Sequence, residues 1–161
     1  FPTRRSSDLF AAIATDLQSG EGVLFRTGNA GMAVRASSSV PGVFQPVSIQ
    51  GREYVDGGLV SPVPAKFARQ LGADYVIAVD ISDKARNSRP QDLVDILLQT
   101  VTIMGERISH YELQDADVVI RPDIRQITAT DFQSRHRAIL EGEKAVNAVL
   151  PQLRQRWLQN R

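Results

Sequence analysis

Residues 55–64 read VDGGLVSPVP. In this stretch Asp56 is followed directly by two glycines, which allow positive φ and a close approach of the backbone to neighbouring groups. A strand that ends at Asp56 can therefore turn sharply. Pro64 stands where a following helix would begin, because its fixed φ suits the first helical turn. The stretch predicts a strand, a tight turn and a helix in that order.

The segments on both sides of this stretch carry strand and helix patterns. Strands are predicted over residues 10–16, 23–26, 47–49, 53–55, 75–79 and 118–120. The turn at 19–22 makes 23–26 a partner of the first strand, residues 50–52 suggest a hairpin, and Gly72 is expected to cap the helix before it. Helices are predicted over residues 30–38, 65–71 and 94–111, and from about residue 133 onward. We expect Pro151 to break or kink the last helix, and the continuous apolar run at 75–79 to be a central strand covered on both faces. The pattern predicts an α/β fold.

Composition excludes several classes of protein. The chain has 161 residues, enough for one domain with a sizeable core. Its net charge of +1 gives no electrostatic argument for nucleic-acid binding. It has no cysteine, which excludes disulfide scaffolds and Cys-based zinc sites and is compatible with a reducing compartment. No apolar run approaches the length of a membrane span.

Four motifs occur in order between residues 10 and 82. They are Ala14-Thr15-Asp16, RASSSVPG at 35–42, VDGGLVSPVP at 55–64 and LGADYVIAVD at 71–80. Together they resemble the C-terminal half of the patatin-like phospholipase domain, most closely its small bacterial single-domain members. The resemblance implies a partial three-layer α/β/α domain with a mostly parallel central sheet. It assigns residues 10–82 to that half-domain and residues 83–161 to a helical C-terminal tail packing on the same domain.

The resemblance implies a catalytic role for Asp56. A serine hydroxyl is a poor nucleophile until a base takes its proton, and in the family's Ser-Asp dyad a carboxylate does so directly. The motif residues Gly57 and Gly58 would give the tight placement that such a base requires. The family's glycine-rich oxyanion loop and its Gly-x-Ser-x-Gly nucleophile motif do not occur in this sequence. Taken alone, Asp56-Gly57 would be interpreted as an ordinary turn.

The serines at 37–39 are not flanked by glycines in the manner of a nucleophile elbow. Short hydroxyls near a helix end more often hydrogen-bond the local backbone. We expect Ser37, Ser38 and Ser39 to shape the floor of a pocket, with one of them supporting Asp56. Pro41 is expected to end the preceding helix.

The remaining polar candidates favour structural roles. Asp80 follows a strand, where α/β sheets often bind ligands, but no phosphate-binding glycine loop accompanies it. Loop anchoring is therefore favoured there over a metal or phosphate site. Asp16 is expected to organise the turn that follows it. His110 and His136 lack partner spacing and are expected on the surface.

We expect the following partners and location. The resemblance implies a lipid or acyl-ester substrate, no cofactor and no metal. The basic end at Arg154, Arg156 and Arg161 favours a solvated face, with transient membrane-surface contact as the alternative. Apolar faces left bare would favour self-association. A cytoplasmic location is favoured, and we expect the true N-terminus to lie outside this sequence.

Three functional hypotheses follow. The first is a fragment of a patatin-like serine lipid acyl hydrolase that carries the aspartate without the serine and is inactive alone. The second is a non-catalytic binding or regulatory module that retains part of a hydrolase fold. The third and weaker one is a phosphate- or metal-binding domain that uses Asp80. Residues 1–9 lack apolar periodicity and are expected to be a foreign head, with a native disordered start as the alternative.

Overall fold

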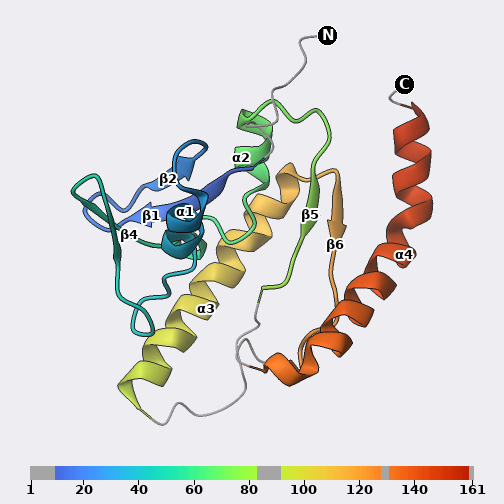
Figure 1. Ribbon diagram of the computed structural model, residues 1–161. Coiled ribbons are helices and arrows are strands. Elements are labelled where there is room, and N and C mark those ends of the chain that lie inside the picture. Colours follow the sequence, from blue (N-terminus) through green and yellow to red (C-terminus); the bar gives the residue numbers. More distant parts are fainter. Residues whose placement is uncertain (1–9, 83–91, 128–130, 160–161) are drawn as a thin grey trace.

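The computed structural model describes residues 10–82, 92–127 and 131–159. The expected head at residues 1–9 lies outside them. The strands are β1 (Ala12–Asp16), β2 (Gly22–Phe25), β3 (Val47–Ile49), β4 (Arg52–Asp56), β5 (Ile77–Val79) and β6 (Val118–Ile120). The helices are α1 (Ala30–Ser37), α2 (Ala65–Gln70), α3 (Leu93–Glu112) and α4 (Arg135–Gln159), with short 3₁₀ turns η2 (Gly57–Leu59), η3 (Leu113–Asp115) and η4 (Phe132–Ser134). The predicted α/β class is confirmed (Figure 1).

Four of the strands form an antiparallel sheet in the order β2-β1-β4-β3. The expected parallel pairing occurs only between β5 and β6, where Ile77 is opposite Val118. The difference arises from the connections. Gln50 and Gly51 have φ of 51° and 79° and join β3 to β4 in two residues, and positive φ at both positions suits a tight antiparallel hairpin. The crossover through α3 is long enough for parallel strands.

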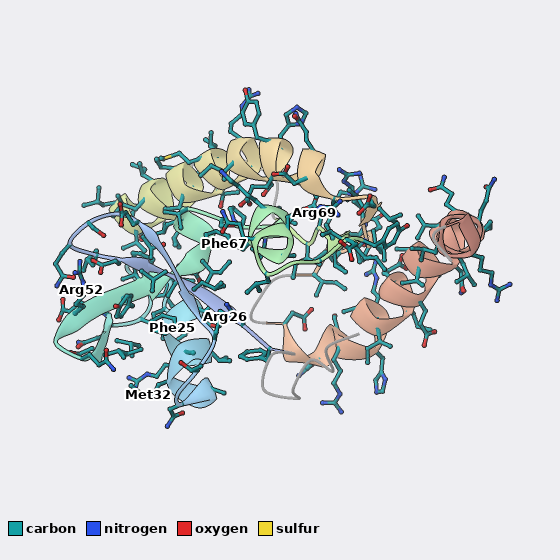
Figure 2. The ribbon with its side chains drawn as sticks, turned by 90° about the horizontal axis from the view of Figure 1, so that it is seen from above. Phe25, Arg26, Met32, Arg52, Phe67 and Arg69 are labelled. Carbon is teal, nitrogen blue, oxygen red and sulfur yellow. The ribbon has the colours of Figure 1, made fainter. Side chains whose placement is uncertain are left out.

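Helices cover both faces of the four-stranded sheet around β1. On one face, α1 packs on a buried cluster of Ala14, Ala36, Val47 and Tyr54, and Figure 2 shows Phe25 and Met32 on this side. On the other face, a Cβ at Gly22 would lie 3.1 Å from Val60 and 3.3 Å from the Phe67 ring. The segment from η2 to α2 therefore packs directly on β2. This produces a local helix–sheet–helix layering around β1 and β2.

β5 differs from its prediction. Its middle residue, Ala78, is buried, but Ile77 and Val79 are 49% and 53% exposed. Among the described residues one face of this strand is thus uncovered, and the expectation of a strand covered on both faces is wrong for this part of the chain. Its apolar run has the composition of a buried parallel strand, yet β6 is its only partner in the described sheets.

The two predicted long helices form. α3 exposes the apolar residues Leu97, Met104 and Tyr111, which the heptad-like pattern would place on a packed face. α4 continues through Pro151 to Gln159 without a break, and its last part runs in a different direction from its first part (Figures 1 and 2), in agreement with the predicted kink. Within the described ranges, no helix has both the length and the apolar character needed to cross a membrane.

We expect the chain to self-associate, because α3 and β5 leave apolar side chains in water. Sedimentation velocity over a concentration series should show association in the wild type and mostly monomer in a Leu97→Glu, Met104→Glu double variant. A charge at exposed Asn147 of α4 serves as the matched control and should leave association unchanged. A wild-type chain that remains monomeric throughout would contradict this expectation.

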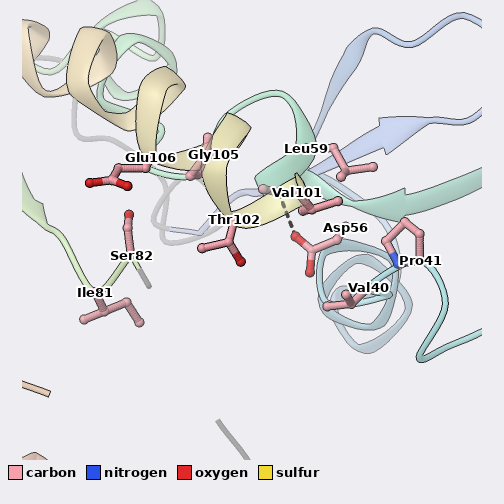
Figure 3. Close-up of a pocket in the computed structure, with 12 residues that line it drawn as sticks. Val40, Pro41, Asp56, Leu59, Ile81, Ser82, Val101, Thr102, Gly105 and Glu106 are labelled. Atoms are coloured by element: carbon pink, nitrogen blue, oxygen red, sulfur yellow. Dashed lines mark hydrogen bonds between the residues drawn. The ribbon is translucent and has the colours of Figure 1, made fainter. Parts of the chain in front are cut away.

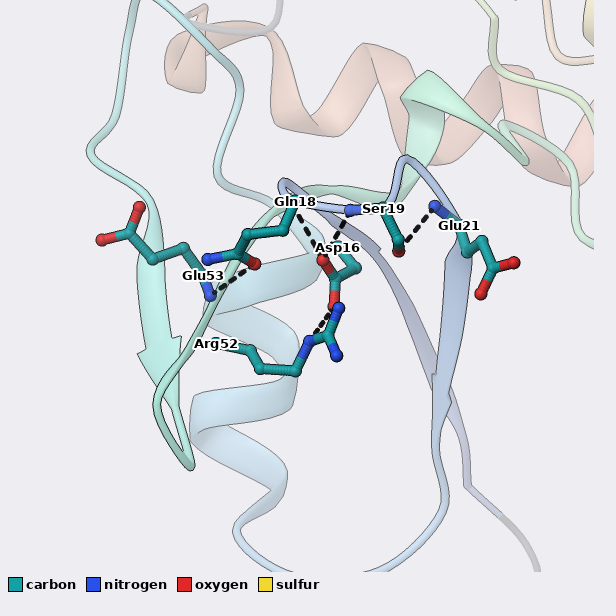
Figure 4. A network of polar contacts seen from close by, with 6 residues as sticks. All are labelled: Asp16, Gln18, Ser19, Glu21, Arg52 and Glu53. Carbon is teal, nitrogen blue, oxygen red and sulfur yellow. Dashed lines mark hydrogen bonds and ion pairs between the residues drawn. The ribbon is translucent and has the colours of Figure 1, made fainter.

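Asp16 organises the turn between β1 and β2, as predicted (Figure 4). It is 2% exposed, and its Oδ1 accepts hydrogen bonds from the backbone N–H groups of Gln18 (2.9 Å) and Ser19 (3.1 Å). Its Oδ2 accepts a hydrogen bond from the Arg52 guanidinium. That bond is the main reason why the pKa of Asp16 falls from 3.8 to about 2, against the opposing effect of burial. The pair ties the β1–β2 turn to the β3–β4 hairpin.

This lowered pKa predicts an acid-labile contribution to stability. Asp16 stabilises the folded state above its ordinary pKa of 3.8, and the contribution is lost as the pH falls through about 2. Asp16→Asn should therefore be less stable than wild type near neutral pH, and its free energy of unfolding should fall less steeply with acid in that window. Urea unfolding at a series of pH values measures this. Parallel pH dependences for the two proteins would show that the ion pair contributes nothing.

Candidate active site

The backbone of Asp56 is fixed by two neighbouring segments. Asp56 is the last residue of β4 and lies opposite Ala14 of β1. Its N–H donates to the Ser39 carbonyl at 3.0 Å, and its own carbonyl accepts from the Thr15 hydroxyl at 2.8 Å. The backbone N–H and C=O of Asp56 are thus each held by a residue of another segment, Ser39 and Thr15.

The carboxylate of Asp56 has one bonded oxygen and one uncommitted oxygen. Oδ1 accepts from the Gly58 N–H at 2.7 Å and caps η2, as the dashed line in Figure 3 shows. No described residue donates a hydrogen bond to Oδ2. Burial raises the pKa of Asp56 above 3.8, and the bond from Gly58 offsets part of that rise. The free oxygen is therefore a stronger proton acceptor than that of a solvated aspartate.

The two glycines after Asp56 serve close packing. A Cβ at Gly57 would lie 2.1 Å from the Ile13 carbonyl oxygen, inside the backbone of β1. A Cβ at Gly58 would lie 3.0 Å from Asp56 Oδ1. The expected close backbone approach is present at Gly57, whereas the expected positive φ is absent at both positions. The motif therefore allows η2 to lie against the backbone of β1 and leaves room for the bonded carboxylate.

Two of the three serines make local hydrogen bonds through their hydroxyls, as predicted. The Ser38 hydroxyl donates to the Val34 carbonyl at 2.9 Å, and the Ser39 hydroxyl donates to the Arg35 carbonyl at 2.7 Å. Ser39 is buried and supports Asp56, but it does so through its backbone carbonyl. Ser37 and Ser38 line a cavity beside Asp56.

Asp56 lies in the wall between two cavities. One, of about 240 Å³, also contains Pro41 and is bounded by α3. Its apolar lining residues are Val40, Pro41, Leu59, Pro62, Ile81 and Val101. The other, of about 390 Å³, lies toward Phe10, Val34 and Ser37. Gly58 and Pro62 border both cavities. Of the predicted site residues, Asp56 and Gly58 thus meet both spaces, while Pro41 and Ser37 each meet one.

The contribution of α3 to this site was not foreseen from the sequence. Val101, Thr102, Gly105 and Glu106 line the 240 Å³ cavity (Figure 3). Near the end of the same helix, the Glu112 carboxylate accepts from the Ser61 hydroxyl and, at 2.9 Å, from the Val63 N–H. Glu112 thus ties α3 to the segment after the glycines. The only signal in the sequence was a glycine inside an otherwise strong helical pattern.

The remaining candidates have the structural roles that were favoured. Asp80 accepts from the Ser82 N–H at 3.1 Å and pairs with Arg121 at 3.2 Å, so it anchors the loop after β5. His110 and His136 are exposed. Among the described residues, no three acidic or histidine side chains lie together in a group that could hold a metal ion.

Comparison with known proteins adds family information to this geometry. Residues 9–69 match the sequence model described as patatin-like phospholipase. Residues 9–69 belong to the patatin-like phospholipase family. This membership supports a lipid hydrolase type of function, and it covers the segment that positions Asp56.

Curated relatives of this patatin-like segment come from bacteria and animals. An uncharacterized NTE family protein of Mycobacterium tuberculosis is 38% identical over 85 residues, which is 50% of this chain and 24% of that protein. A second such protein from the same organism is 26% identical over 166 residues, which is 88% of this chain and 28% of that protein. Patatin-like phospholipase domain-containing protein 7 of Mus musculus is 34% identical over 89 residues, 52% of this chain and 7% of that protein. The chain thus matches between 7% and 28% of the length of these relatives.

Proposed function

We propose that this chain carries the general-base half of a Ser-Asp dyad in a patatin-like lipid acyl hydrolase. In the proposed reaction a serine from an upstream segment attacks the carbonyl carbon of an ester, and its hydroxyl proton passes to Asp56 Oδ2. The ester C–O bond then breaks, and the leaving alcohol takes that proton. Water then attacks the acyl-serine carbonyl carbon and gives a proton to Asp56, the bond from the acyl carbon to the serine oxygen breaks, and that oxygen takes the proton back from Asp56.

One observation carries this proposal above the others. Asp56 combines a fixed backbone, one bonded oxygen and one free oxygen in a half-buried wall shared by two cavities. An aspartate that only shapes a turn makes the same bond through one oxygen, so the feature that favours a base is the place of Asp56 in the lining of both cavities. A carboxylate base needs one oxygen available to a hydroxyl within hydrogen-bond reach. The raised pKa of Asp56 brings it closer to the working range of a base.

The substrate class follows from the family and from the lining of the cavity. The proposed substrates are carboxylic esters of phospholipids or other acyl lipids, because the space beside Asp56 is bordered mainly by apolar side chains. The proposed reaction uses side chains and water alone. The serine and the donors for the oxyanion would come from the upstream segment.

The test is to sequence the locus upstream and to express the longer reading frame beside the 161-residue chain. We expect the longer protein to contain Gly-x-Ser-x-Gly and to hydrolyse a p-nitrophenyl acyl ester, while the short chain is inactive. Loss of an acyl-transfer nucleophile costs roughly a million-fold in turnover. Substantial activity of the short chain that survives replacement of Ser37, Ser38 and Ser39 by Ala, but not Asp56→Asn, would contradict the proposal. An inactive longer protein would favour the non-catalytic module.

A further inference from the structure

The cavity of 240 Å³ is a slot with α3 along one side. Figure 3 shows Val101 near Asp56, with Thr102, Gly105 and Glu106 following along the helix toward Ser82. Leu59 and Pro62 line the slot from the segment after the glycines. A chain whose ester group lies at Asp56 would therefore run along the surface of α3. Exposed Glu106 marks the solvated end of this path.

Gly105 is the position where a side chain would narrow this slot. A Cβ there would lie 3.8 Å from Pro62 Cγ, which is ordinary van der Waals contact. Alanine would therefore fit, and it would favour the helix far more than glycine does. Helix stability thus does not explain this glycine. Its effect is to leave the space between α3 and Pro62 open.

Hydrogen bonds fix the distance between α3 and the segment that carries Pro62. Glu112, two turns beyond Gly105, binds the Ser61 hydroxyl and the Val63 N–H through its two carboxylate oxygens. Ser61 is buried, and its N–H donates to the Gly57 carbonyl at 2.8 Å. The slot therefore has a width set by hydrogen bonds that also involve the turn after Asp56.

We propose that Gly105 determines acyl-chain length at this site, and that the slot accepts a straight chain of medium length. An apolar cavity of roughly 150 Å³ holds the six carbons of benzene, so 240 Å³ holds about eight to ten carbons. The identity of the ligand as an acyl chain rests on the proposed function. The role of Gly105 rests on the geometry of the slot.

Binding to the 161-residue chain tests the proposal without any catalytic step. The probes are methyl esters of straight-chain acids of increasing length, titrated while the NMR signals of the Leu59, Ile81 and Val101 methyl groups are followed. We expect affinity to rise about fourfold per added methylene and to stop rising at about eight to ten carbons. The chain length at which affinity stops rising is called the break. Signals of these methyl groups should shift together.

Two glycine-to-leucine variants provide a matched pair. Gly105→Leu fills the slot and should weaken binding of methyl octanoate at least about tenfold, moving the break to shorter chains. Gly142→Leu, inside α4 with nothing within 4 Å of its Cβ position, should bind as wild type does. Val101→Ala enlarges the slot and should move the break to longer chains, which keeps the test valid if Gly105→Leu fails to fold.

Three results would overturn the inference: no response of the three methyl signals, an affinity that keeps rising without a break, or equal behaviour of the two leucine variants. If affinity stops rising at about eight to ten carbons but the longer protein is inactive, the proposed function is wrong and the inference about the slot stands. An active longer protein without a break would remove only the inference about Gly105.

Discussion

Gly57→Ala is expected to destabilise the chain by at least about 3 kcal/mol, because the new methyl group has no space. Its Cβ would lie 2.1 Å from the Ile13 carbonyl oxygen and 2.8 Å from the Ile13 carbonyl carbon. These are backbone atoms of β1, which cannot rotate away as a side chain could. For a chain of this size the melting temperature should fall by roughly 6–12 °C. Circular dichroism melting and urea unfolding measure the effect.

Gly142→Ala is the matched control for this substitution. It adds the same methyl group in open space inside α4, where alanine is the better helix former by about 1 kcal/mol. The control should therefore be as stable as wild type or more so. If Gly57→Ala melted within a degree or so of wild type, η2 would not lie against the β1 backbone as described.

Asp56→Asn is expected to lower kcat of the longer, serine-containing protein about 10²–10⁴-fold, the usual contribution of a general base. Asparagine keeps an oxygen for the Gly58 N–H but cannot accept the proton of a serine hydroxyl. The fold should therefore persist while turnover is lost. Asp74→Asn, at an exposed aspartate outside both cavities, should leave kcat unchanged. Equal kcat for wild type and Asp56→Asn would exclude this residue as the base.

The pH dependence of the same enzyme follows from the raised pKa of Asp56. The base is active only when ionised, so kcat/KM should fall as the pH drops through a pKa above the ordinary value of 3.8.

Gly58→Ala should also reduce kcat of the longer protein, since its Cβ would lie 3.0 Å from Asp56 Oδ1 and would displace the carboxylate. In the pH profile of the wild-type enzyme, a kcat/KM that falls only below pH 3.8 would mean that a group other than Asp56 controls the rate.

Local chemistry explains why much of this structure could be predicted from the sequence. The hairpin at Gln50 and Gly51, the loop held by Asp16 and the end of α2 at Gly72 depend on residues close together in the chain. The end of β4 at Asp56 was likewise predicted from the two glycines that follow it directly in the sequence. In each case the turn residue and the groups that it satisfies are neighbours in sequence.

The α3 side of the site could not be predicted, because it depends on contacts between distant residues. Glu112 binds Ser61 from 51 positions away, and no periodicity encodes that pairing. The two hairpins of the four-stranded sheet were predicted from their short connections, but the antiparallel pairing of β1 with β4 joins strands far apart in the chain and was missed. At Gly57 the close approach was foreseen, but the partner, Ile13, is visible only in three dimensions.

The most direct measurement of the central claim is a crystal structure of the longer protein with its upstream segment. We predict that Asp56 Oδ2 lies about 2.6–3.2 Å from the hydroxyl oxygen of the Gly-x-Ser-x-Gly serine, at the wall between the two cavities. A serine bonded to a histidine instead, with Asp56 directed into solvent, would contradict the account.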